Sequence, residues 1–349
     1  MKEVKMILPN LASDTAGAAS ALFSLGGLTV IHDAAGSLEV FINYEEAREL
    51  DEKRTVGSKL NRLDAITGND QVLLDKILAE CEVSPPPFIA IIGSPVPFTI
   101  GTDLNGIAAE VENLTGIPAF AVTAGGFGTY DKGAGEAMKK LIQKCTYSPV
   151  PHVGSIVNLL GATPMDYSSA EIQGVCYGLK TEGWDQVRTL TMAEGMDEIY
   201  HAAEADMNLV ISVSGLAAAK FMKQKHGIPY SIGLPTKKPS LPGSRVLVLG
   251  EAIFSKLLCK NLTDSGSIAV AGIIGTDKSE IFPEVTSIQL DAEQKIMSEL
   301  KNGYDIVIGD PLYKLLLPKD FTGIYIERPH RALSGRLFPP NQHALDVLI

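Results

Sequence analysis

The sequence predicts an α/β protein of three units with parallel β-sheets, the last two of which resemble small Rossmann-like βαβ sets. Short apolar runs rich in β-branched residues alternate with amphipathic helical stretches along the whole chain. The runs are continuous rather than alternating, which is typical of strands that helices cover on both faces. Because strand and helix alternate throughout, we expect the strands to lie parallel to one another.

The strands are expected where apolar runs of roughly four to eight residues occur. They are residues 28–32, 88–92, 119–123, 155–160, 208–213, 245–249, 267–274, 305–308 and 323–326. Asp14 is expected to cap a first helix that ends at the glycines 26–27, and Asp103 to begin a helix that Gly116 ends. Further helices are expected over 132–143, 168–181, 196–205, 216–226, 252–263, 292–302 and 311–316.

Two stretches have the composition of joints between domains. Residues 148–154 (SPVPHVG) are rich in proline and glycine, and residues 235–244 (PTKKPSLPGS) hold three prolines. A chain of 349 residues is long enough for two or three domains. The predicted domains are therefore an N-terminal α/β domain, 1–148, and two Rossmann-like domains, 149–236 and 237–349.

Composition and charge exclude several classes of function. With 45% hydrophobic and 20% charged residues, the chain is globular rather than disordered. A net charge of −11 repels phosphate backbones, so nucleic acid is not an expected partner. No uncharged apolar run reaches the length of a membrane span, and the N-terminus lacks the apolar region of a secretory signal. We therefore expect a cytoplasmic protein.

The cysteines and histidines form no local metal motif. Cys81, Cys145, Cys176 and Cys259 are far apart and include no CxxC pair, so we expect reduced, mostly buried thiols. No histidine pair has zinc-site spacing, and no metal ligand is assigned. Histidines that follow a strand are more informative, because ligands of open α/β sheets bind beyond the carboxyl ends of strands. His32 and His330 hold such positions, although a purely structural role is the alternative for each.

Two further segments are candidates for binding. The segment GGFGTYDKGAG, residues 125–135, follows a strand and opens a helix whose N-terminus could hold an anion near Gly125, Gly126 and Phe127. It matches neither common nucleotide motif, so a tight turn or a surface for another subunit is the alternative. In the segment ERPHR, Arg328 and Arg331 could clamp a carboxylate or phosphate, or else form surface ion pairs.

Six segments in order resemble the nitrogenase component 1 family, which comprises the subunits of nitrogenase and related maturation scaffolds and tetrapyrrole reductases. The resemblance runs nearly end to end and implies three Rossmann-like domains around a central cleft. The segments are IHDAAGS (31–37), residues 100–138 with IGTD and GIPAF, VNLLG (157–161), residues 205–230 with VISVSG and GIPY, GYDIVIGDP (303–311) and GIYIERPH (323–330).

The resemblance also implies which cluster ligands are missing. Family members hold an interfacial iron–sulfur cluster with cysteines at three positions, and here these are Ser13, Ser37 and Pro95. Ser37 lies in the same turn as His32. Serine and proline are poor ligands for iron–sulfur clusters. A [4Fe–4S] cluster would therefore have to come mainly from a partner subunit. Ser212 stands near the family's cofactor-anchoring cysteine, and His330 aligns with its cofactor histidine.

The function implied by the resemblance is that of a nitrogenase-like oxidoreductase subunit. In such an ATP-dependent reductase complex, an iron protein passes electrons to a metallocofactor, tetrapyrrole or other small substrate in the cleft. His330 would act there as ligand or proton donor. The alternatives are a non-redox binding or maturation scaffold for a metallocofactor, and a structural pseudo-subunit. A homodimer, or a heterodimer with a paralogue, is expected, with the faces around Ser37, Pro95 and Phe127 buried.

Overall fold

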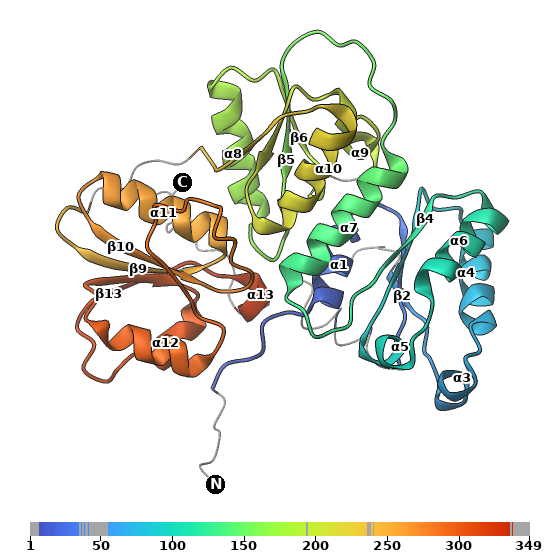
Figure 1. Cartoon of the computed structure of the whole chain (residues 1–349), viewed down its shortest axis with the longest axis horizontal. Coiled ribbons are helices and arrows are strands. Elements are labelled where there is room, and N and C mark those ends of the chain that lie inside the picture. Colours follow the sequence, from blue (N-terminus) through green and yellow to red (C-terminus); the bar gives the residue numbers. More distant parts are fainter. Residues whose placement is uncertain are drawn as a thin grey trace.

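A computed structural model of the chain describes residues 7–34, 36, 38, 41, 55–192, 195–235, 239, 241–335 and 337. The described strands form three separate sheets, and every pair of neighbouring strands is parallel. Figure 1 shows three lobes, one for each sheet. The predicted α/β class with three parallel-sheet units is confirmed.

The first sheet has the strand order β2-β1-β3-β4. Residues on alternate sides of its buried strands belong to two hydrophobic clusters, one shared with α4 and α6 and the other with α1 and α7. Helices therefore cover both faces, as the continuous apolar runs indicate. The elements of this part are α1 (Asp14–Leu22), β1 (Leu28–Ile31), β2 (Thr55–Gly57), α3 (Arg62–Thr67), α4 (Gln71–Val83), β3 (Ile89–Ile92), α5 (Pro95–Ile100), α6 (Leu104–Thr115), β4 (Ala119–Val122) and α7 (Tyr130–Cys145).

The second sheet has the order β6-β5-β7-β8. A capping box begins α8, because Ser168 and Glu171 each bond the other's backbone N–H. The elements are β5 (Ile156–Leu160), α8 (Ser169–Thr181), β6 (Gln186–Thr189), α9 (Asp197–Tyr200), the 3-10 turns Ala202–Glu204 and Val213–Gly215, β7 (Met207–Val210), α10 (Leu216–His226) and β8 (Tyr230–Ile232).

The third sheet has the order β11-β10-β9-β12-β13. From β9 the chain adds β10 and β11 on one side and then β12 and β13 on the other, so the strand order reverses between β9 and β12. Such a reversal is the usual place for a ligand crevice, at the carboxyl ends of the strands. The elements are β9 (Arg245–Gly250), α11 (Ala252–Asp264), β10 (Ile268–Ile273), β11 (Ser287–Gln289), α12 (Glu293–Glu299), the 3-10 turns Leu300–Asn302 and Pro311–Leu316, β12 (Ile306–Gly309), β13 (Ile324–Glu327) and α13 (Arg331–Ser334).

The structure differs from the sequence expectations mainly at sheet edges. The four unpredicted strands, β2, β6, β8 and β11, are all edge strands of three or four residues, and most of their residues are exposed or half-buried. The sequence also did not predict the helix α4, whose N-cap Asp70 makes no side-chain cap bond, or the short helices α3, α5 and α13. Ser13 caps α1 in place of the expected Asp14. The helices expected over 196–205 and 292–302 each divide into a short α-helix and a 3-10 turn, and 311–316 is a 3-10 turn.

The helix α7 contacts elements of all three units, the third of them through its first residues Tyr130 and Asp131. Its Gly133 lies so close to α1 that an added Cβ atom would be 1.8 Å from the backbone oxygen of Asp14. On another side, α7 contacts the 3-10 turn Val213–Gly215 and α10 of the second sheet. The three sheets lie within the predicted domains 1–148, 149–236 and 237–349, whose boundaries stay a prediction. Among the helices described, none is long and apolar enough to cross a membrane.

Candidate functional site

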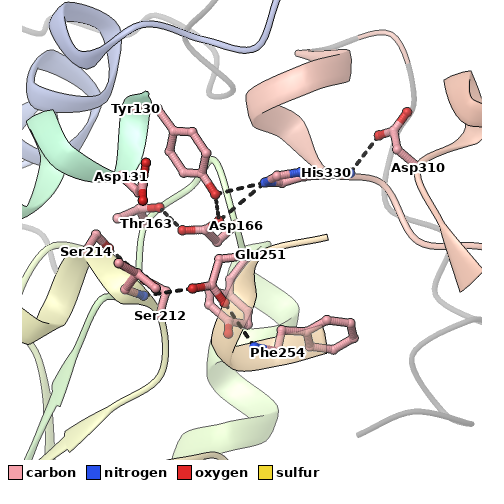
Figure 2. A network of polar contacts seen from close by, with 12 residues as sticks. Tyr130, Asp131, Thr163, Asp166, Ser212, Ser214, Glu251, Phe254, Asp310 and His330 are labelled. Atoms are coloured by element: carbon pink, nitrogen blue, oxygen red, sulfur yellow. Dashed lines mark hydrogen bonds and ion pairs between the residues drawn. The ribbon is translucent and has the colours of Figure 1, made fainter. Parts of the chain in front are cut away.

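Three side chains, one from each unit, meet in a buried polar cluster (Figure 2). Tyr130 begins α7, Asp166 follows β5, and His330 follows β13. The Tyr130 hydroxyl lies 2.9 Å from His330 Nε2 and donates a hydrogen bond to the carboxylate of Asp166. His330 Nε2 is 3.5 Å from Asp166 Oδ1. All three residues are at most 3% exposed. We call this cluster the triad.

Further hydrogen bonds hold each member of the triad in place. Thr163 Oγ1 donates to Asp166 Oδ2 over 2.9 Å. The backbone N–H of His330 donates to Asp310 Oδ2 over 2.7 Å, and Asp310 comes directly after β12. The triad is therefore fixed by residues that follow β5, β12 and β13, at the carboxyl ends of strands from two sheets.

The direction of the hydrogen bonds in the triad follows from protonation. Burial, and then the negative charge of Asp166, raises the pKa of the Tyr130 hydroxyl well above its usual value, so the hydroxyl stays protonated. Its one proton goes to Asp166, so its oxygen accepts from His330, which must carry a proton on Nε2. The other ring nitrogen, Nδ1, is buried without a hydrogen-bond partner among the described residues.

A second buried carboxyl group, that of Glu251, connects the third unit to the second. Its Oε1 accepts from the backbone N–H of Val213 over 2.8 Å, and its Oε2 accepts from that of Phe254 over 3.0 Å. Burial, and next the nearby charge of Asp166, raises the pKa of Glu251 to about 8. The carboxyl group is therefore mostly protonated at neutral pH.

Arg328 lies in this region but is not open to an anion. Its guanidinium carbon is 3.5 Å from the ring centroid of Phe254. Its Nη2 atom donates to the backbone oxygen of Asp166 over 3.2 Å and lies 3.5 Å from Glu171 Oε1. The side chain is only 7% exposed. The structure therefore uses Arg328 to join the second and third units, and Arg331, at the start of α13, is half-buried.

Ser212 is also enclosed by protein. Its hydroxyl donates to the backbone oxygen of Gly161 over 2.7 Å and lies 2.6 Å from the hydroxyl of Ser214. The side chain is fully buried. The side chain therefore already bonds protein atoms at the position that the resemblance gives to a cofactor-anchoring residue.

The turns that contain Ser13, Pro95 and residues 125–128, where the resemblance implies a cluster, lie beside one another. Ser13 Oγ accepts from the backbone N–H of Ala16, and Pro95 is the first residue of α5. Gly126, with φ +72°, packs on the Pro95 ring, where an added Cβ atom would lie 2.5 Å from Pro95 Cγ. Phe127 is 77% exposed. The structure thus brings Ser13, Pro95 and residues 125–128 close together, and Ser13 pairs with Thr129, the residue before Tyr130 of the triad.

His32 belongs to the same region but is buried. Its Nδ1 lies 2.9 Å from the Ser58 hydroxyl, and burial lowers the pKa of its ring. A neutral, hydrogen-bonded imidazole is consistent with the structural alternative given for this residue. Ser37, the remaining cluster-turn position, lies outside the described residues.

The residues present do not fit the iron–sulfur cluster that the resemblance implies. Cys81, Cys145 and Cys259 are buried in three different helices, and Cys176 is half-buried in a fourth. Burial raises the pKa of the Cys145 thiol to about 12, which disfavours the thiolate that binds metal. In the described part of the chain, no three His, Cys, Asp or Glu side chains are grouped as metal ligands.

A cavity that the sequence did not predict lies at the carboxyl edge of the third sheet. It has a volume of about 430 Å³, and its walls include Gly275 after β10, Leu290 after β11 and Tyr313 after β12. Leu8 and Leu11 close one side, held there in part because Leu8 N donates to Glu293 Oε1 over 2.6 Å. The volume is in the range of small-molecule sites, and no cysteine or histidine lines it.

Comparisons with known proteins agree with this fold. A family model described as nitrogenase component 1 type oxidoreductase matches residues 13–236. The chain is 31% identical over 188 residues to the nitrogenase iron-molybdenum cofactor biosynthesis protein NifE of Clostridium pasteurianum, and this match covers 51% of the chain but only 39% of that protein. The solved structure "Nitrogenase Cp1 at pH 6.5" matches with a TM-score of 0.69 and 12% identity over 97% of this chain and 92% of that one. "Nitrogenase Cp1 at pH 5" also gives 0.69, with 14% identity over 99% and 88%.

Proposed function

We propose a function for this chain on the premise that it belongs to the nitrogenase component 1 type oxidoreductase family, whose model matches residues 13–236. The proposed function is that of a non-redox binding or maturation subunit for a metallocofactor. The observation that carries it is the lack of a thiolate set, because Ser13 caps a helix and Pro95 has no donor atom.

Two features support a binding role over electron transfer by this chain. His330, the expected ligand or proton donor, has its Nε2 atom already bonded within the triad. The cavity of about 430 Å³ has the volume of a small-molecule site, and no cysteine or histidine lines it. A metallocofactor or its precursor would then be held between this chain and a partner that supplies the ligands. The name of the relative NifE, a cofactor biosynthesis protein, agrees with such a role.

A second candidate is a subunit of an ATP-dependent reductase, and an exposed aromatic pair favours it. Phe98 and Phe127 are 58% and 77% exposed, and their ring centroids are 6.3 Å apart. They flank Pro95 and Gly126, at the turns where the family places its interfacial cluster. Exposed neighbouring aromatic rings are typical of a protein–protein contact. A paralogue or second copy bound here could contribute the cysteines, with an iron protein as electron donor.

The first experiment is anaerobic purification of the chain alone and together with a cysteine-bearing paralogue. Iron and sulfide are counted per chain, and absorption spectra are recorded. The proposal expects a colourless, metal-free chain that acquires iron only in the complex. Iron, sulfide and charge-transfer absorption in the isolated chain would refute the non-redox role. Reduction of a substrate by the complex, dependent on an iron protein and ATP, would favour the second candidate.

The partner contact is tested with Phe127→Ser. Because this substitution removes an exposed apolar ring, we expect the chain to associate with its paralogue or with a second copy at least about tenfold more weakly, a loss of about 1.4 kcal/mol or more. Analytical ultracentrifugation measures this association. Val153→Ser, at a fully exposed position in another part of the chain, serves as the matched control. Equal effects of both substitutions would place the contact elsewhere.

A further inference from the structure

A groove between α7 and α10 carries positive charge on an otherwise acidic chain. It has a volume of about 560 Å³ and is lined by Lys139, Gln143, Ala217, Lys220, Phe221, Gln224 and Lys225. No aspartate or glutamate is among these residues, although the chain as a whole has a net charge of −11. We call Lys139, Lys220 and Lys225 the groove lysines.

The charge of the groove lysines is poorly neutralised. Among the described residues, Lys139 and Lys225 take part in no ion pair. Lys220 Nζ lies 3.9 Å from Glu280 Oε1, and both side chains are more than half exposed, so water screens this pair. In contrast, Lys144, further along α7, is paired with Glu112.

The sequence of α10 supplies much of this charge. The helix α10 contains Lys220, Lys223, Lys225 and His226 and no acidic residue. Burial, and next the positive charge of Lys225, lowers the pKa of His226, which agrees with a positive potential at this end of the helix. Like charges that face one groove repel one another, so an acidic occupant would stabilise the chain there.

We propose that this groove binds an acidic segment of a partner protein. Carboxylates would pair with the groove lysines, and the side-chain amides of Gln143 and Gln224 can both donate to and accept from a peptide backbone. Phe221, half-buried in the groove wall, offers an apolar contact. The proposal goes beyond the proposed function and involves neither the triad nor the Phe98–Phe127 face.

A nucleic acid fits this groove less well than an acidic peptide. The groove contains no arginine, the side chain that binds phosphate in a bidentate manner. A polynucleotide also extends beyond the groove, where the acidic surface of the chain repels it. A short peptide segment can place its carboxylates in the groove alone.

The test uses a fluorescein-labelled, glutamate-rich peptide and fluorescence anisotropy with the full chain at low ionic strength. One variant combines Lys139→Gln, Lys220→Gln and Lys225→Gln. Its matched control combines Lys278→Gln, Lys301→Gln and Lys319→Gln, exposed lysines of the third unit, and has the same net charge. A variant with arginine at the three groove positions keeps the charge. Circular dichroism verifies that each variant is folded.

We expect the groove variant to bind the peptide about tenfold more weakly, or about 1.4 kcal/mol, and the control and arginine variants to bind as the natural chain does. Equal weakening in the groove variant and its control would overturn the proposal, because only overall charge would then matter. No peptide binding by the natural chain at low ionic strength would also overturn it. The proposal would also be overturned if single-stranded RNA or anionic vesicles displaced the labelled peptide and unlabelled peptide did not.

Discussion

The substitution Tyr130→Phe tests whether the triad holds the three units together. The hydroxyl donates to the carboxylate of Asp166 and accepts from His330 Nε2 at 2.9 Å, and the ring around it is fully buried. The substitution keeps the ring packing and removes only these two bonds. His330 Nε2 and Asp166 Oδ1 are left 3.5 Å apart, too far for a good replacement bond without a shift.

The expected loss is about 2 kcal/mol in the free energy of unfolding, because a hydrogen bond to a charged group contributes about 1.5–3 kcal/mol. If the units unfold together, the thermal midpoint should fall by roughly 3 °C, because the unfolding entropy of a chain of 349 residues is large. Urea unfolding at neutral pH, followed by circular dichroism, measures the change.

The matched control is Tyr177→Phe. Tyr177 lies on α8 and is 73% exposed, so loss of its hydroxyl should change stability by less than about 0.5 kcal/mol. If Tyr130→Phe unfolds at the same urea concentration as the natural chain, the triad does not stabilise the junction and the reasoning is wrong. Equal losses in both variants would point to a general effect of removing a tyrosine hydroxyl.

Three further predictions concern packing, pH and thiol reactivity. Gly133→Ala should destabilise the chain by about 1–3 kcal/mol or more in urea unfolding, because the added Cβ atom would lie 1.8 Å from a backbone oxygen of α1. Its control is Gly174→Ala on α8, where the added Cβ atom would meet no atom within 4 Å, so this substitution should stabilise the chain by up to about 1 kcal/mol. Glu251 has a pKa raised from 4.5 to about 8, so its contribution to stability is present below pH 4.5 and lost as the pH rises through 8. The stability deficit of Glu251→Gln relative to the natural chain should therefore shrink between pH 5 and pH 8.5, and a constant deficit would contradict the assignment. A maleimide should label the native chain at half-buried Cys176 before buried Cys259, as peptide mass spectrometry can show.

The sequence predicts the buried strands well and the edge strands poorly, for a physical reason. Strands such as β3 are covered on both faces, so their apolar runs are unbroken. The strand β8 has two half-buried residues and one exposed residue, which leaves no apolar run to recognise. Its hydrogen bonds to β7 depend on the rest of the sheet and cannot be derived from its own three residues.

The candidate site was predictable only in part. His330 could be singled out because it follows a strand, but its partner Tyr130 is 200 residues away in sequence, and no local motif contains Asp166. The role expected for Arg328 was that of an anion clamp, yet the packing of Phe254 against it encloses the guanidinium. Burial of this kind results from how the units pack together. The absence of cluster cysteines, by contrast, is a property of residue identity, and the sequence alone shows it.

The position of α7 has a consequence for how the chain can be divided. The helix contacts α1 on one side and α10 on another, and after it Tyr147 stacks on Tyr200 of the second unit with ring centroids 4.8 Å apart. The exposed residues 148–154 that follow are thus a covalent link between surfaces already joined by packing. A chain cut in this link should remain one particle, and fragments 1–148 and 149–349 made separately should reassemble. We therefore expect the first two units to stay joined without this covalent link as long as α7 is intact.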